Sequence, residues 1–199
     1  MEKLEAVQML LRAIGSSPVN SLNVAHPDVA NALSSLERLR KSVQKRGWWF
    51  NTDYNVVFQA EVGTGEVGIP KEITKFIPAE ATFVKRGRKV YNSQTQTFNI
   101  GTSVTALKTV RSLEWEDLPS SMQEYAAYLA CAQFISDELE DTTKEEKYQK
   151  LAGIAKIDLD AEDLESIKVN VFHNARVMRA RSGQTPYQNR INLRPNSYI

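Results

Sequence analysis

The sequence predicts an α+β fold, in which both ends of the chain build a helical bundle and an antiparallel β region is inserted between them. Apolar residues recur at helical spacing before residue 47 and again after residue 119. Between these stretches, apolar residues alternate with polar ones, as in strands that are buried on one face. No helical pattern separates the strands, which favours an antiparallel sheet over a doubly wound one.

Four helices are expected, at residues 2–14, 27–46, 119–141 and 143–181. Gly15 supplies the left-handed residue that ends the first helix, and Pro27 stands at the first position of the second. The third helix is apolar on two adjacent faces, so we expect it at the centre of the bundle. Thr142 and Thr143 each precede a glutamate by three residues, which predicts a capping box for the fourth helix. That helix could break near residues 158–160.

The β-rich insertion is expected at residues 48–113. Apolar side chains alternate at residues 56–62, and Val- and Thr-rich residues 103–113 predict another strand. A hairpin is expected at residues 82–91, with Arg86-Gly87-Arg88 at its turn. Trp48 and Trp49 begin the insertion; as neighbours in a strand they would point to opposite faces, so one of them could anchor an interface.

These elements predict a single domain at residues 1–181 and an extended tail at residues 182–199, which lacks periodicity and contains Pro186 and Pro195. The lone cysteine, Cys131, excludes an intrachain disulfide and a cysteine-based zinc site. It lies among apolar residues of the third helix, so we expect it to be buried and inert.

The net charge of +1 conceals three blocks of different sign. Residues 1–113 hold 15 basic and 9 acidic residues, and residues 114–165 hold 4 basic and 15 acidic residues. Residues 166–199 hold 6 basic residues and no acidic ones. Separated blocks of opposite sign allow copies of a chain to pair head to tail, an arrangement that builds rings.

Cofactor and metal sites are not expected. Residues 63–68 (GTGEVG) match the dinucleotide fingerprint, but Ile69 and Pro70 follow where a helix should begin, so a loop between strands is favoured. The two histidines, His26 and His173, lack ligand spacing, and each is expected to be a helix cap or a surface residue. No apolar run approaches the ~20 residues that a membrane helix needs, so we expect no membrane insertion.

Four segments, taken in order, resemble the tail tubular protein A family of short-tailed phages. They are residues 14–22 (IGSSPVNSL), 46–51 (RGWWFN), 83–91 (FVKRGRKVY) and 118–119 (LP). The resemblance implies a structural virion protein, the head-to-tail adaptor, whose copies form a dodecameric ring. It further implies contacts with the portal protein, the tail nozzle (tubular protein B), the tail fibre and, non-specifically, the double-stranded DNA that passes through the ring. Assembly would take place in the host cytoplasm, and the family offers no catalytic motif to transfer.

Within such a ring, we expect residues 114–165 of one copy to lie near basic surface of the next, and the tail to dock on a neighbouring ring or the portal. The expected interface side chains are two tryptophans, seven arginines and a tyrosine: Trp48, Trp49, Arg86, Arg88, Arg176, Arg179, Arg181, Arg190, Arg194 and Tyr198.

Two other function classes stay open at this point. The carboxylates of residues 137–141 crowd one helix end, and glycosidases use paired carboxylates, so a carbohydrate-degrading tail component is the alternative. We expect these carboxylates to form a solvated face and the protein to be no enzyme. The basic segments also allow a DNA-binding module, although no known recognition motif accompanies them.

Overall fold

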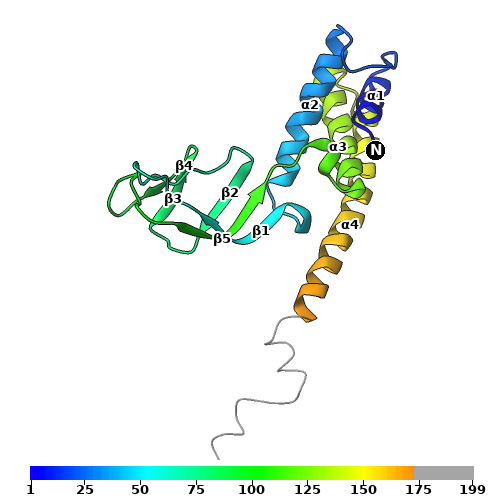
Figure 1. The fold of residues 1–199 in the computed structure, drawn as a ribbon. Helices are drawn as coiled ribbons and strands as arrows, with labels where there is room; N and C mark the ends of the chain where they lie inside the picture. The colour runs from blue at the N-terminus through cyan, green and yellow to red at the C-terminus, as the bar shows by residue number, and fades with distance from the viewer. Residues whose placement is uncertain (173–199) are drawn as a thin grey trace, which may run out of the picture. The chain divides into compact units, whose positions relative to one another are not determined.

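The computed structural model describes residues 1–172 of the chain (Figure 1). Backbone contacts divide the chain into two compact units, of which the first covers Met1–Leu159 and the second begins at Asp160. Within the described residues, the helices are α1 (Lys3–Ala13), α2 (Pro27–Gln44), α3 (Ser120–Glu138) and α4 (Thr142–Phe172), with 3₁₀ turns η1 (Trp49–Asn51) and η2 (Trp115–Asp117). The strands in the same residues are β1 (Thr52–Phe58), β2 (Ile73–Pro78), β3 (Phe83–Arg86), β4 (Lys89–Asn92) and β5 (Val104–Arg111).

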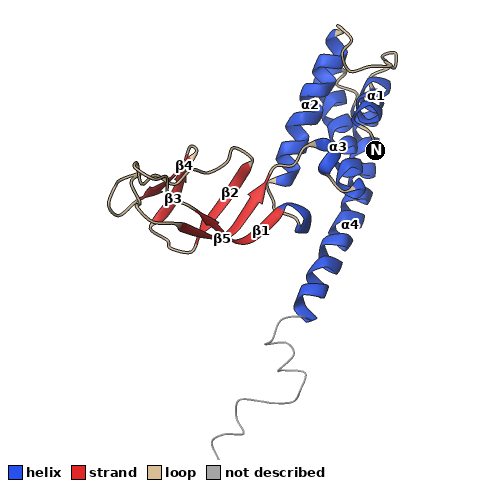
Figure 2. Cartoon of the chain, viewed as in Figure 1, coloured by secondary structure: helices blue, strands red, loops and turns tan. Residues whose placement is uncertain are grey.

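All these strands lie between α2 and α3 in the chain, so the predicted α+β fold with an inserted β region is confirmed (Figure 2). None of the helices in residues 1–172 has an apolar stretch long enough to cross a membrane. The expected domain at residues 1–181 and the tail at 182–199 extend beyond the described residues, and that division stays a prediction.

Local signals at the helix ends act as the sequence predicts. After α1, Gly15 adopts a φ of 80°, and the N–H of Ser16 donates to the carbonyl of Leu11 at 2.9 Å. This geometry satisfies carbonyl groups that the helix end leaves free. At the start of α2, the Nδ1 of His26 accepts the N–H of Asp28 at 3.2 Å, so this histidine caps a helix.

The bundle core is built around α3, as expected. One fully buried side chain from each helix illustrates the packing: Leu10, Leu36, Met122 and Leu159 belong to a single apolar cluster. Because α3 buries residues on most of its circumference, it has little amphipathic character of its own.

The capping of α4 differs from the prediction. The N–H of Lys144 donates to the Oδ1 of Asp141 at 3.1 Å, so Asp141 caps the helix, whereas Thr142 and Thr143 already lie inside its first turn. A carboxylate also interacts favourably with the positive end of the helix dipole. The helix shows no break at residues 158–160. Residues 173–181 of the expected helix lie outside the described residues.

The β region contains antiparallel sheets, as predicted. One has the order β1-β5-β2, and the other pairs β3 with β4. Strand β2 is not among the predicted strands; its register against β5 shifts at Lys75 and at Pro78. A second apolar cluster fills this region and consists of Phe58, Val67, Ile69, Ile73, Val90, Val104 and Ala106.

Two predictions for the β region need correction. The strand expected at residues 56–62 ends at Phe58, and Val62 is fully exposed, because the chain turns where the N–H of Gly65 donates to the carbonyl of Glu61. Trp48 and Trp49 are not strand neighbours; they form the start of a 3₁₀ turn, and both contact the bundle core. The predicted hairpin is confirmed.

Candidate interaction surfaces

A buried polar junction joins α2 to the two connections of the β region. The carboxamide of Gln44, which is fully buried, accepts the N–H of Leu113 at 2.7 Å and donates to its carbonyl at 3.1 Å. The Nδ2 of Asn51 donates to the carbonyl of Arg111 at 2.8 Å and to that of Gln44 at 3.1 Å. These bonds satisfy backbone groups at the points where the chain enters and leaves the β region.

Arg40 supplies the charged part of this junction. Its side chain is only 2% exposed, forms ion pairs with Glu37 at 2.7 Å and Glu114 at 3.1 Å, and donates to the carbonyl of Leu113. Burial raises the pKa of Glu37, but hydrogen bonds from Lys3 and Arg40 outweigh that effect and leave the pKa below its ordinary value. The guanidinium is therefore fully used inside the subunit.

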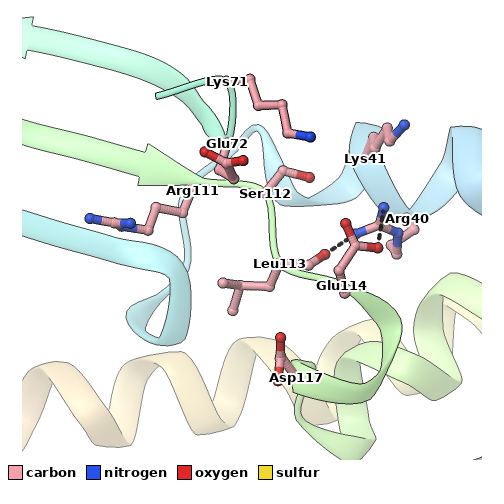
Figure 3. Close-up of a pocket in the computed structure, with 9 residues that line it drawn as sticks. All are labelled: Arg40, Lys41, Lys71, Glu72, Arg111, Ser112, Leu113, Glu114 and Asp117. Atoms are coloured by element: carbon pink, nitrogen blue, oxygen red, sulfur yellow. Dashed lines mark hydrogen bonds and ion pairs between the residues drawn. The ribbon is translucent and has the colours of Figure 1, made fainter. Parts of the chain in front are cut away.

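A depression of about 500 Å³ lies beside the junction (Figure 3). It is lined by residues of α2, the start of β2 and the segment after β5: Arg40, Lys41, Lys71, Glu72, Arg111, Ser112, Leu113, Glu114 and Asp117. Its lining includes four cationic and three anionic side chains, so it does not concentrate one sign of charge as a site for a phosphate or a metal ion would. A mixed-charge lining is typical of the rim of a protein–protein contact.

The two tryptophans have different surroundings. Trp48 is 2% exposed; its Nε1 donates to the carbonyl of Val43 at 2.9 Å, and the guanidinium of Arg46 stacks over its ring at 4.2 Å. Trp49 is half-buried and meets the ring of Phe50 edge to face at 5.0 Å. Trp48 thus contributes to the core of the subunit, and Trp49 is the one with exposed area for an interface.

The hairpin turn presents two arginines. Arg86 stacks on the ring of Tyr91 at 3.7 Å, and Arg88 is exposed in the turn, where Gly87 adopts a φ of 59°. The neighbouring Lys89 is paired with Glu66. The remaining expected interface residues lie outside the described residues: Arg176, Arg179, Arg181, Arg190, Arg194 and Tyr198.

The carboxylates at the end of α3 have structural partners. Asp137 forms an ion pair with Arg38 at 3.1 Å, and Glu138 accepts from the Nδ2 of Asn31 at 3.2 Å. Asp137 and Glu145 both line a depression of about 280 Å³. A glycosidase needs two carboxyl groups that face each other across a substrate, whereas Asp137 and Glu138 each contact a side chain of α2. The geometry does not favour the carbohydrate-degrading alternative.

The glycine-rich segment and the cysteine behave as expected. Residues 63–68 form a loop with isolated bridges, and no helix follows them. Cys131 is fully buried, and burial raises the pKa of its thiol to about 12. Within residues 1–172, histidine, cysteine and acidic side chains do not gather in a group that could hold a metal ion. His173 lies outside the described residues.

Sequence reasoning missed two features. No local sequence pattern predicts the buried polar junction around Arg40, because the cationic residues next to it in the sequence, Arg38 and Lys41, are exposed. Apolar Ile154 and Ile157 on α4 are exposed. The sequence indicates an apolar helix face there through the spacing of three, four and three residues between Ile154, Ile157, Ala161 and Leu164.

Comparison with known proteins identifies the family. The family model described as tail tubular protein matches residues 4–172. Tail tubular protein A of Klebsiella phage KP34 is 28% identical over 141 residues, which is 70% of this chain and 74% of that protein. The chain therefore belongs to the tail tubular protein family and is a structural component of a bacteriophage tail.

Proposed function

We propose that the chain is the ring-forming adaptor that joins the portal protein to the tail nozzle and surrounds the path of the DNA. The family match over residues 4–172 carries this proposal, since it includes both the bundle and the β region. The adaptor works without a cofactor, assembles in the host cytoplasm and then contacts the portal, tubular protein B, the tail fibre and, non-specifically, double-stranded DNA.

Neighbouring copies meet through surfaces of opposite charge. The acidic block at residues 114–165 begins with exposed Glu114, Glu116 and Asp117, which belong to or flank η2. Arg86 and Arg88 are exposed on the hairpin of the β region. A cyclic ring requires contact between two different surfaces of the subunit, and these two have complementary sign.

The ring itself is tested by native mass spectrometry and negative-stain electron microscopy of the purified chain with purified portal. We expect a closed ring bound to the portal. A chain that neither forms rings nor binds the portal would overturn the proposal.

The charge contact is tested by combining Arg86→Glu with Arg88→Glu. Ring formation on the portal should fall at least about tenfold, because each introduced glutamate would face the acidic surface of the neighbouring copy. The matched control, Arg86→Lys with Arg88→Lys, keeps the charge and should assemble. Equal assembly of the reversed and the control variants would exclude the hairpin from the contact.

The tail is tested by truncation after Arg181. We propose that residues 182–199 dock on the portal or a neighbouring ring, so the shortened chain should keep its circular dichroism spectrum and melting temperature but lose portal attachment. Unchanged attachment would rule out this role of the tail.

A further inference from the structure

One face of the sheet β1-β5-β2 carries a row of exposed side chains around a lysine. Lys108 of β5 lies between Tyr54 of β1 and Ile77 of β2, so these three side chains share a face. Tyr54 is 66% exposed and Ile77 is 37% exposed, and the Nζ of Lys108 lies 6.0 Å from the centre of the Tyr54 ring. Exposed Lys75 is paired with Val110, two residues from Lys108, and therefore points to the same face. The sheet patch consists of four side chains: Tyr54, Lys75, Ile77 and Lys108.

Within the described residues, strands β1, β2 and β5 place no carboxylate on this face. Their acidic residue, Asp53, precedes Tyr54, lies on the opposite face and forms an ion pair with Arg111 at 2.7 Å. Glu72, which precedes β2, lines the depression beside the junction together with Arg111. The sheet patch therefore combines positive charge with uncovered apolar area, which suits a protein surface of opposite charge. A DNA backbone would supply phosphates but no apolar partner for Tyr54 and Ile77.

The turn between α3 and α4 has the complementary features. Leu139 is 44% exposed, and in the first compact unit it is the exposed large apolar residue with an acidic neighbour on each side, Glu138 and Glu140. Both glutamates are exposed. The N–H groups of Leu139 and Glu140 donate to the carbonyl of Ile135 at 2.9 and 3.2 Å, and Glu140 has a φ of 53°, so hydrogen bonds fix the turn where the helix ends. The acidic turn consists of Glu138, Leu139 and Glu140.

The sheet patch and the acidic turn lie near opposite ends of α2. Glu138 accepts a hydrogen bond from Asn31, near the start of that helix. Lys108 lies near its other end, since the Cε of Lys108 is 3.5 Å from where a Cβ on Gly47 would be. Asn31 and Gln44 are separated by about 20 Å along the helix axis. Contact between the two surfaces therefore takes two copies of the chain, and a contact through two different surfaces repeats from copy to copy, as a ring requires.

We propose that the sheet patch of one copy receives the acidic turn of the neighbouring copy. Leu139 packs between Tyr54 and Ile77, and the two glutamates pair with the two lysines. This inference rests on the proposed ring and adds a second contact to that of the hairpin. Both contacts set the β region of one copy against the acidic block of the next.

The charge pairing is tested by assembly of purified chains on purified portal. Lys75→Glu with Lys108→Glu should lower ring formation at least about tenfold, whereas the matched control, Lys75→Arg with Lys108→Arg, should assemble. Adding Glu138→Lys and Glu140→Lys to the reversed chain should restore assembly, because both sides of the contact then change sign.

Three outcomes would overturn the contact. They are equal assembly of the reversed and control chains, failure of the added glutamate substitutions to restore assembly, and normal assembly of the reversed chain with lost binding to double-stranded DNA, which would assign the sheet patch to DNA. A wild type that forms no ring would instead overturn the proposed function itself.

Proximity is tested with cysteines, an approach that does not depend on the folding of the charge variants. Cys131 is fully buried, so introduced cysteines are the reactive ones. Portal-bound rings of a chain with Ile77→Cys and Leu139→Cys are treated with a short bismaleimide and quenched before a denaturing gel. A ladder of linked copies should appear, while each single variant should stay at the chain mass of 22.5 kDa, because the two surfaces differ.

The matched control for proximity is Val62→Cys with Leu139→Cys. Val62 is fully exposed elsewhere in the β region, so this chain should give no ladder. Rings of the Ile77 and Leu139 variant that give no ladder, or ladders of equal strength from both chains, would show that the sheet patch does not hold the acidic turn.

Discussion

The side chains of Gln44 and Asn51 form hydrogen bonds with backbone N–H and carbonyl groups at the base of the β region, as neighbouring strands do with each other inside it. Each offers a donor and an acceptor in one carboxamide, so each can satisfy two or three backbone groups at once. A buried backbone group without a partner costs about 1–3 kcal/mol, which makes these two residues sensitive positions.

Gly47 provides the sharpest steric prediction. Its φ is 83°, and a Cβ there would lie 2.7 Å from the Cγ2 of Val110, so we expect Gly47→Ala to lower the free energy of unfolding by about 3 kcal/mol. Gly15 has a φ of 80° and open space, and Gly15→Ala should cost about 1 kcal/mol from backbone strain alone. Urea denaturation of both variants measures the difference, and equal losses would show that Val110 imposes no steric limit.

Arg40 is the charged residue whose removal should matter most. Arg40→Ala leaves the carbonyl of Leu113 and the carboxylate of Glu37 without this partner, and we expect a loss of about 3 kcal/mol in unfolding free energy. The control is Arg38→Ala, whose exposed ion pair with Asp137 should contribute less than about 1 kcal/mol. Similar losses in the two variants would contradict the role of burial.

The lowered pKa of Glu37 predicts a pH dependence. The unfolded carboxyl binds its proton at higher pH than the folded one, so the stabilisation is present above the ordinary glutamate pKa of 4.5 and is lost as the pH falls through the folded pKa. The stability of wild type should therefore fall more steeply below about pH 5 than that of Glu37→Gln. Parallel curves from thermal unfolding at a series of pH values would exclude Glu37 as the source.

At the scale of secondary-structure elements, the start of α4 has two candidate N-cap residues, Asp141 and Thr142, and mutation can distinguish between them. Asp141→Ala should lower the unfolding free energy by about 1 kcal/mol, because it removes the acceptor for the N–H of Lys144. Thr142→Ala, one residue further along, should change it by less than about 0.5 kcal/mol. A larger loss of unfolding free energy in Thr142→Ala than in Asp141→Ala would support the capping box that the sequence predicts.

The helices were predictable because their signals are local. A glycine in the left-handed region, a proline at the first position and an apolar stripe each act within a few residues, as at Gly15 and Pro27. Strand β2 carries a weaker signal, since it ends at Pro78, a residue that counts against strands. The proline is tolerated because β2 is an edge of the sheet β1-β5-β2.

The junction could not be predicted for a different physical reason. Arg40 meets its carbonyl partner 73 residues further along the chain, and no periodicity connects them. Trp48 and Trp49 were misassigned to a strand because aromatic residues favour strands, whereas their packing against the bundle imposes a 3₁₀ turn. Tertiary contacts decided both cases.

At the scale of the whole molecule, the segregated charge predicts how assembly responds to salt. If the acidic block of one copy meets basic surface of the next, ring formation on the portal should weaken severalfold between about 0.05 and 0.5 M salt. Light scattering at a series of salt concentrations measures this. Assembly that is unchanged or strengthened by salt would indicate a contact dominated by apolar burial.

The bonds between Gln44 and Leu113 hold the entry and exit of the β region together, independently of what lies between them. The cost of closing a loop grows only with the logarithm of its length, so segments of very different size could be carried by the same pair of ends. The position after α2 is thus a natural graft point. Evolution could exchange the β region, or an engineer could replace it with another small domain, while the helices keep their packing.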